Sequence, residues 1–177
     1  SNNLLHRVFW VHNSYANRAS VPQLFLNSIR KYYNMFNPDI TYLAWDSKIF
    51  KGQSNFRKDE CTEYKKTRDR ERDDEIYKHE KSIKALCESL GIRNICPGVL
   101  EADDVIHWLC TYYNDHEKVV VSVDQDLAQL VSETTMVFSP IKNVQITPEN
   151  FEDVMKVPVK HFVKYKALMG DKSDNII

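Results

Sequence analysis

The chain has 177 residues, 42% of them hydrophobic, which is enough for one compact domain with a sizeable buried core. Its sequence contains no apolar run near the roughly 20 residues needed to cross a bilayer, which excludes a membrane-spanning protein and predicts a soluble one. The formal net charge of −1 lacks the basic excess typical of nucleic-acid-binding domains, so only the distribution of charge is informative. The four cysteines show no C-x-x-C spacing, which favours free thiols in a reducing, intracellular setting over disulfides or a zinc site.

The first half of the chain alternates strand-like and helix-like segments. The β-rich apolar run 40–45 predicts a buried strand. Residues 51–81 are highly charged and poor in aliphatic side chains, so we expect an exposed loop or a mobile helical excursion with little share in the core. Apolar residues at helical spacing then predict a helix over 82–90 that ends at Gly91, with a strand over 92–96.

The second half continues this alternation. Residues 104–113 place a broad apolar face on a helix, and we expect Trp108 on that face to lie in the core. The run 119–123 is the strongest buried-strand signal in the sequence. Residues 147–149 (Thr-Pro-Glu) predict a helix start, with threonine as the N-cap and proline at the first helical position. An apolar helical stretch follows at 162–169.

Strands that alternate with helices indicate an α/β protein. We expect a central, mainly parallel sheet flanked by helices. A single domain would span residues 1–177, with the charged segment 51–81 as an insertion.

Acidic residues directly follow two of the predicted strands. Asp46 comes after the run 40–45, and Asp124 and Asp126 come after the run 119–123. Ligand sites of open α/β sheets lie beyond the carboxyl ends of the strands, so both sets could share one cleft. An Asp-x-Asp sequence after a strand is also a common turn, which is the alternative for Asp124 and Asp126.

Two further acidic sets accompany predicted helices. Glu101, Asp103 and Asp104 open a helix, where capping and the helix dipole also favour acids. Asp171 and Asp174 follow the apolar helical stretch and could be ordinary turn residues. Each set therefore has a structural explanation when it is taken alone.

Taken together, the four acidic sets predict a metal site. If they converge, each pair of carboxylates about 4 Å apart costs about 4 kcal/mol at an effective dielectric near 20. Several such pairs would rival the whole stability of a domain, about 5–15 kcal/mol. A divalent cation would remove this conflict, and oxygen-only ligands favour Mg²⁺ or Mn²⁺. Two such ions form the usual clamp for phosphodiester hydrolysis.

Three acidic segments occur in order at residues 101–104 (EADD), 122–130 (SVDQDLAQL) and 168–176 (LMGDKSDNI). They resemble the signature blocks of the 5′-to-3′ exonuclease and flap endonuclease family, which includes bacteriophage enzymes and the 5′-nuclease domain of bacterial DNA polymerase I. Asp46 matches the acid that ends the family's second strand. The resemblance covers nearly the whole chain and implies a PIN-like catalytic domain.

The resemblance also bears on both ends of the sequence. Residues 1–7 look like the helix start that follows the family's first strand, so we expect the aspartate that ends this strand just upstream of Ser1. The family continues past the third block into a helix-hairpin-helix module that grips duplex DNA, with potassium in several members. We therefore expect a catalytic domain truncated at both ends.

The charged segment resembles the base of the family's helical arch or gateway. The similar residues are Phe56-Arg57 and the run 64–68 (YKKTR). The resemblance implies that Lys65 and Arg68 contact the scissile phosphate and that Tyr64 stacks on or steers a displaced base. It places Arg57 and Lys66 in the same nucleic-acid-binding set. Since acids nearly balance these bases, an ordinary solvated face is the alternative.

By resemblance, the reaction is two-metal hydrolysis of phosphodiester bonds at the 5′ ends, flaps or single-strand/duplex junctions of DNA, in replication or repair. Asp46, Lys65 and Arg68 would form the catalytic set. The direct metal ligands would be Glu101, Asp103, Asp124 and Asp126. The ligands that bind directly or through water would be Asp46, Asp104, Asp171 and Asp174. We expect a monomer in the cytoplasm of a bacterium or phage-infected host, with RNA primers or RNA–DNA hybrids as further substrates.

Two other functions fit parts of this pattern. Phosphatases of the haloacid dehalogenase type also use Asp-x-Asp after a strand, but they usually carry threonine two residues later, where this chain has Ala128. A degenerate nuclease that only binds nucleic acid is the non-enzymatic alternative. No acid of the matching blocks is missing from the sequence, which argues against degeneration.

Overall fold

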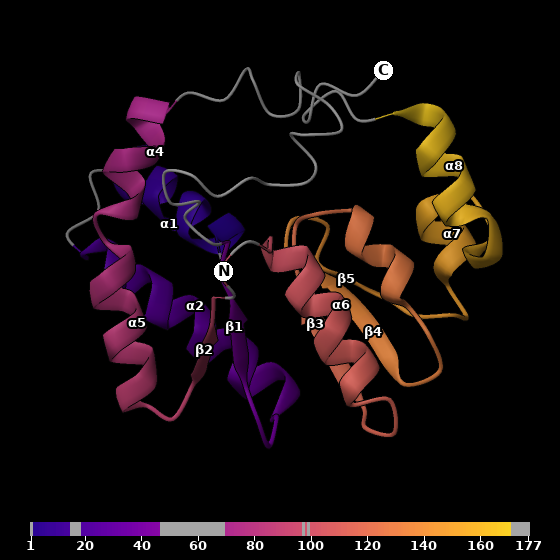
Figure 1. Cartoon of the computed structure of the whole chain (residues 1–177), viewed down its shortest axis with the longest axis horizontal. Helices are drawn as coiled ribbons and strands as arrows, with labels where there is room; N and C mark the ends of the chain where they lie inside the picture. The colour runs from indigo at the N-terminus through magenta and orange to yellow at the C-terminus, as the bar shows by residue number, and fades with distance from the viewer. Residues whose placement is uncertain (1, 15–18, 47–69, 97, 99, 171–177) are drawn as a thin grey trace. The chain divides into compact units, whose positions relative to one another are not determined.

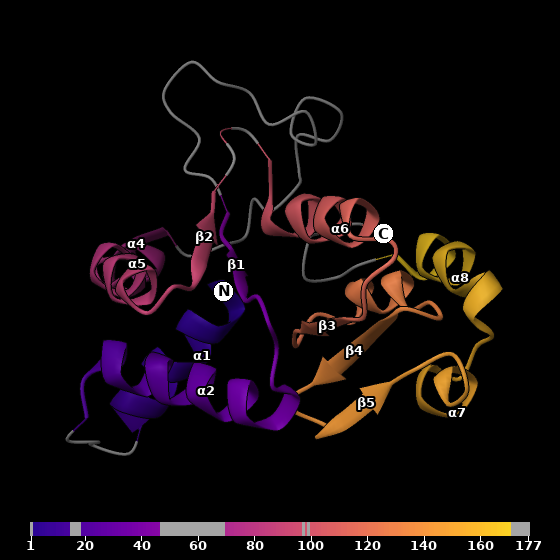
Figure 2. The same ribbon diagram turned by 90° about the horizontal axis from the view of Figure 1, so that it is seen from below.

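The computed structural model describes residues 2–14, 19–46, 70–96, 98 and 100–170. They group into two compact units, which are described separately below. The first unit contains the described residues up to 46 and those from 70 to 102, and the second contains those from 103 to 170. Figures 1 and 2 show the chain from indigo at its start to yellow at its end. The single-domain organisation stays a prediction.

The first unit packs helices against a pair of strands. Its helix α2 begins where the Ser20 hydroxyl accepts a hydrogen bond from the backbone N–H of Gln23. It ends at Asn37, whose left-handed backbone (φ 43°) lets its N–H donate to the carbonyl of Tyr33. The elements of the unit are α1 (Asn2–Ser14), α2 (Val21–Phe36), β1 (Tyr42–Ala44), α4 (Arg70–Tyr77), α5 (Glu80–Ser89) and β2 (Arg93–Ile95).

The two strands of the first unit are parallel, with Leu43 opposite Asn94. The chain leaves α5 through Gly91, whose φ of 78° favours glycine. Three residues separate the end of α5 from the start of β2. Figure 2 shows α5 alongside β2, with α1 and α2 side by side. Because the strands are parallel, the residues that follow β1 and β2 leave at the same edge of the sheet.

The core of the first unit is built from α1, α2, β1, α4 and α5 together with Trp45 and Ile92. Leu5 of α1, Phe25 of α2, and Ile83 and Cys87 of α5 are fully buried there. Trp45, directly after β1, is also fully buried and stacks on Phe25 with ring centroids 5.9 Å apart. Burial, with a smaller contribution from the negative charge of Glu88, raises the pKa of the Cys87 thiol to about 11.

The end of the charged segment contributes more to this core than the sequence suggested. Residues 51–69 lie outside the described residues. Residues 70–77 form α4, and its Ile76 is fully buried in the core of the first unit. Ile76 is the only aliphatic residue between positions 51 and 81, and the neighbouring Tyr77 packs against the same core while half-buried.

The second unit packs helices on a three-stranded sheet. Strands β3 and β4 are parallel, and β4 and β5 are antiparallel. Val120, Val137 and Ile146 form the buried centre of this sheet, and Phe151 meets Phe162 edge to face at 5.4 Å. The elements are α6 (Ala102–Tyr112, in this unit from residue 103), β3 (Lys118–Val121), the 3₁₀ turn η1 (Asp126–Leu130), β4 (Thr135–Ser139), β5 (Val144–Ile146), α7 (Phe151–Met155), η2 (Val159–His161) and α8 (Phe162–Met169).

The predicted α/β fold with parallel strands is confirmed. The three predicted strands correspond to β1, β2 and β3, and the helices predicted at 82–90, 104–113 and 162–169 correspond to α5, α6 and α8, whereas α2, β4 and β5 were not predicted. The helix start predicted at residues 147–149 is wrong. Those residues form a turn, and α7 begins at Phe151. Asn150 ties the turn together, since its Oδ1 accepts from the Thr147 N–H and its Nδ2 donates to the Gln145 carbonyl.

The prediction that Trp108 lies in the core is also wrong. Its side chain is 55% exposed and stacks on Tyr112, one helical turn later, with ring centroids 5.1 Å apart. Helix α6 packs instead through Val105, Ile106 and Cys110. When the apolar face of a helix is broader than the surface it packs against, some of its apolar side chains stay exposed. The sequence alone does not show which ones.

Two further observations concern the helices and the cysteines of the described residues. None of the helices described is both long and apolar enough to cross a membrane. Cys87, Cys96 and Cys110 are free thiols, as predicted, and Cys61 lies outside the described residues.

Replacing Ile83 by alanine should lower the free energy of unfolding by about 2–5 kcal/mol, because it leaves a cavity in the core of the first unit. The matched control is Leu86→Ala on the same helix, where the side chain is 41% exposed and the expected loss is about 1 kcal/mol or less. Urea unfolding measures both. Equal losses would contradict the assignment of the α5 face.

Candidate functional site

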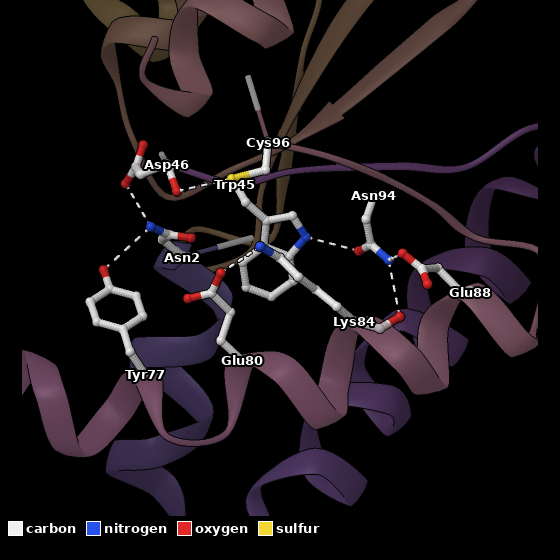
Figure 3. Close-up of polar contacts among 9 residues, drawn as sticks. All are labelled: Asn2, Trp45, Asp46, Tyr77, Glu80, Lys84, Glu88, Asn94 and Cys96. Carbon is white, nitrogen blue, oxygen red and sulfur yellow. Dashed lines mark hydrogen bonds and ion pairs between the residues drawn. The ribbon is translucent and has the colours of Figure 1, made fainter. Parts of the chain in front are cut away.

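Asp46 lies at the carboxyl end of β1 and is half-buried. Its Oδ2 accepts a hydrogen bond from Nδ2 of Asn2 at 2.7 Å, and its Oδ1 accepts one from the backbone N–H of Ala102 at 2.8 Å. Figure 3 shows the Asn2 amide between Asp46 and the Tyr77 hydroxyl. Each carboxylate oxygen is therefore oriented by an N–H donor from a different part of the first unit.

Glu101 is brought to the same edge of the sheet as Asp46. The parallel ladder extends one residue beyond β1, where the Trp45 N–H donates to the Ile95 carbonyl at 2.9 Å. The chain after β2 then reaches Ala102, whose N–H binds Asp46. Glu101 is the residue before this contact, so its backbone lies close to Asp46 within the first unit, as the strand-end argument expected.

A polar network fixes the strand end beneath Asp46 (Figure 3). The indole N–H of Trp45 donates to Oδ1 of Asn94 at 2.9 Å, and Nδ2 of Asn94 donates to the Lys84 carbonyl at 3.0 Å. The Lys84 ammonium lies 4.9 Å from the centroid of the Trp45 ring and pairs with Glu80. These contacts lock Trp45, and through it the direction in which Asp46 leaves the strand.

In the second unit, Asp124 and Asp126 shape the turn that follows β3. The Asp124 N–H donates to the Ser122 hydroxyl at 3.1 Å, and Oδ1 of Asp124 accepts from the Asp126 N–H at 2.9 Å. Asp126 is then the first residue of η1. The turn interpretation of this Asp-x-Asp sequence is therefore correct in part, because Asp124 makes the local bond typical of a turn. The same bond holds the Asp124 carboxylate in place shortly after the end of β3.

A cation already faces Asp126. The ammonium of Lys166, from α8, lies 2.8 Å from Oδ1 of Asp126, and both side chains are partly exposed. Sequence reasoning missed Lys166, because a lysine on a helix is common and nothing in the sequence indicates that it faces Asp126. In this structure the positive charge beside the Asp126 carboxylate is therefore the Lys166 ammonium.

Asp103 and Asp104 occupy the first turn of α6. Asp103 is exposed and Asp104 is half-buried. Acids in this position are stabilised by the unpaired N–H groups of the helix start, so their location has a structural explanation that does not conflict with a ligand role.

The structure describes only part of the predicted set of ligands and substrate contacts. Within the described part of the chain, no group of three or more His, Cys, Asp or Glu side chains is arranged to hold a metal ion. The acids that are described are divided between two units, and the assignment of all eight as ligands stays a prediction. The donors are oxygen-only, which fits Mg²⁺ or Mn²⁺. The predicted residues outside the described ranges are Arg57, Tyr64, Lys65, Lys66, Arg68, Asp171 and Asp174.

Comparison with known families decides where the chain belongs. Residues 1–156 match the model of the 5′-3′ exonuclease N-terminal resolvase-like domain. The chain belongs to the 5′-3′ exonuclease family. This match confirms the family resemblance that the acidic segments predict.

Relatives of this family member include a 5′-3′ exonuclease of Mycoplasmopsis pulmonis, 30% identical over 99% of the chain and 58% of the relative. A 5′-3′ exonuclease of Bacillus subtilis is 32% identical over 97% of the chain and 61% of the relative. The chain thus spans about three fifths of these curated proteins.

Two solved structures share the fold of this exonuclease-family chain. The T5 5′-exonuclease with divalent zinc ions bound matches with a TM-score of 0.80 at 23% identity, over 99% of this chain and 66% of that one. The bacteriophage T5 flap endonuclease in a complex with DNA and metal ions matches with a TM-score of 0.79 at 22% identity, over 98% and 65%.

Replacing Asp124 by alanine should lower the free energy of unfolding by about 1 kcal/mol, because the Asp126 N–H loses its acceptor. Replacing it by asparagine should have a much smaller effect, since the amide Oδ1 can accept the same bond. Denaturant unfolding of both variants measures the difference. If asparagine costs as much as alanine, the turn depends on the charge rather than on the acceptor.

Proposed function

We propose that this exonuclease-family chain carries the catalytic residues of a divalent-metal-dependent, structure-specific 5′ nuclease acting on DNA. The observation that carries the proposal is the position of its acids. Asp46 with Glu101, and Asp124 with Asp126, lie where parallel strands end in their respective units. Membership of the family supports the reaction type.

In the proposed mechanism, the acidic side chains would hold the ions and the basic side chains would hold the substrate. Bound Mg²⁺ or Mn²⁺ would lower the pKa of the attacking water and stabilise charge on the leaving oxygen. Asp124 would present Oδ2, since its Oδ1 already accepts the Asp126 N–H. Asp126 would exchange the Lys166 ammonium for an ion. Two ions are proposed because phosphodiester hydrolysis commonly uses a pair, and K⁺ would belong to a downstream helix-hairpin-helix module.

The substrate contacts are proposed from the sequence. Lys65 and Arg68 would grip the scissile phosphate, because ammonium and guanidinium groups form short, charge-assisted bonds to phosphate oxygens. Tyr64 would stack on a displaced base, and Arg57 and Lys66 would extend the contact along the strand. The substrates would be DNA 5′ ends, flaps or single-strand/duplex junctions, with RNA–DNA hybrids included, and the protein would act as a monomer in the cytoplasm.

The test uses the full-length protein and a flap duplex labelled at its 5′ end, with Mg²⁺, Mn²⁺ or EDTA. Metal-dependent release of short 5′ products is the expected result. Asp124→Asn should lower cleavage by more than about 100-fold while leaving DNA binding largely intact, since even outer-shell partners of metals are worth about 10–100-fold. The variant keeps the turn acceptor, so a loss would reflect the charge.

The matched control is Asp115→Asn, the same chemical change at an exposed turn residue of the same unit. It should cleave like the unmodified protein. Unchanged turnover in Asp124→Asn would sink the ligand assignment. Flap binding without cleavage would favour a nuclease homologue that only binds nucleic acid. Hydrolysis of p-nitrophenyl phosphate without cleavage of DNA would favour a phosphatase.

A further inference from the structure

Asn2 is a buried polar residue on the apolar side of a helix. It lies at the start of α1, on the face that carries Leu5 and Phe9 into the core, and it is only 8% exposed. A side-chain amide in such a place needs partners, because burying an unpaired polar group costs about 1–3 kcal/mol. Its contacts therefore indicate what it is there to hold.

The contacts of Asn2 point to Asp46. The amide Nδ2 donates to Oδ2 of Asp46 at 2.7 Å and reaches the hydroxyl of Tyr77 at 3.3 Å (Figure 3). The amide Oδ1, in contrast, is buried and has no hydrogen-bond partner among the described residues. Rotating the amide by half a turn would place oxygen against the carboxylate, which is repulsive. The orientation of Asn2 is thus set by the charge of Asp46, at the expense of its own oxygen.

The hydrogen bonds to Asp46 leave it little freedom. Asn2 holds Oδ2 from α1, while the N–H of Ala102 holds Oδ1 at the start of α6. Both donors fix the plane of the carboxylate, yet each oxygen keeps a further lone pair. Asp46 can therefore still accept from an ion or from a water molecule on an ion, but only in one orientation.

We propose that Asn2 is a positioning residue that holds the Asp46 carboxylate in the orientation needed to bind a divalent cation, directly or through water. This inference rests on the proposed metal-dependent function. Asn2 acts through Asp46 and contacts neither the ion nor the substrate. An outer-shell amide of this kind stiffens a ligand, and its loss typically weakens metal binding by about 10–100-fold.

A purely structural role for Asn2 gives a different expectation, and Ser20 provides the comparison. Ser20 is a polar residue of the same unit, and its hydroxyl caps α2 by accepting a hydrogen bond from the Gln23 N–H, away from Asp46. If Asn2 only stabilised the fold, its removal would lower the melting temperature as the removal of the Ser20 hydroxyl does, with no separate effect on metal binding.

The test is a Mn²⁺ titration of the full-length protein and its Asn2→Ala and Ser20→Ala variants, followed by calorimetry and by the electron paramagnetic resonance signal of free Mn²⁺. Asn2→Ala should raise the dissociation constant for Mn²⁺ by about 10-fold. It should also raise the Mn²⁺ concentration that half-saturates cleavage, with kcat at saturating Mn²⁺ close to the unmodified value. Ser20→Ala should lower the melting temperature through the lost helix cap and leave both metal parameters unchanged.

Asn2→Asp provides a second test that changes the volume of the side chain very little. It places a carboxylate against Asp46, so the melting temperature in EDTA should fall through like-charge repulsion. Mn²⁺ should restore more of the melting temperature than it adds to the unmodified protein. This variant decides the question if Asn2→Ala does not fold.

The outcomes separate this inference from the proposed function. Mn²⁺ affinity of Asn2→Ala within about twofold of the unmodified protein, or equal losses of melting temperature for Asn2→Asp in EDTA and Mn²⁺, would overturn the positioning role and leave the nuclease proposal standing. Mn²⁺ binding without cleavage by the unmodified protein would overturn the nuclease proposal while the Asn2 comparison remains decisive. A protein that binds no divalent ion would overturn both.

Discussion

Parallel strand pairing is the constraint on which the candidate site depends. Because β1 and β2 run the same way, the chain emerges from both at one edge of their sheet. There Asp46 accepts a hydrogen bond from the N–H of Ala102, the residue that follows Glu101. In the second unit, β3 runs parallel to β4, and Asp124 follows at the carboxyl end of β3. An antiparallel pair would send successive strand ends to opposite edges. Strand direction therefore gathers acids that are distant in sequence before any ligand is considered.

The packing behind the strand ends makes this arrangement rigid. Trp45 is buried against Phe25, and its indole N–H is bound by Asn94, so the backbone that presents Asp46 has little freedom to turn. Asp46 is held from two further sides. The buried oxygen of Asn2 has no partner among the described residues, and this local conflict is typical of a site shaped by something other than stability. The first unit accepts a poorly satisfied amide in order to orient a charge.

The sequence was sufficient for the features that depend on local patterns. The apolar runs predicted both strands that carry Asp46 and Asp124, and helical spacing predicted α5 and its end near Gly91. It failed where tertiary contacts choose among equivalent local options. Trp108 belongs to an apolar face that is broader than its contact, and the turn after β5 is organised by Asn150 rather than capped by Thr147.

The candidate site divides along the same line. The strand-end acids were visible as residues that follow apolar runs. Asn2 and Lys166 were not, because an amide at a helix start and a lysine on a helix are common everywhere. Only three-dimensional contacts show that each of them faces an acid. Partners of this kind carry no periodic signal, so they are the part of a site that sequence patterns miss.

The hydrogen bonds of the described acids separate two roles that an aspartate can combine. Asp124 supplies an acceptor to the Asp126 N–H, and Asp46 supplies acceptors to Asn2 and Ala102. For the Asp124 turn, asparagine would serve as well, without adding negative charge near Asp126. The hydrogen bond of the Asp124 turn therefore requires an acceptor oxygen at position 124 and not the charge itself. At Asp126 the charge pairs with the Lys166 ammonium. The acceptor of Asp124 sustains the turn, and the metal role proposed for both acids is the one that depends on their charge.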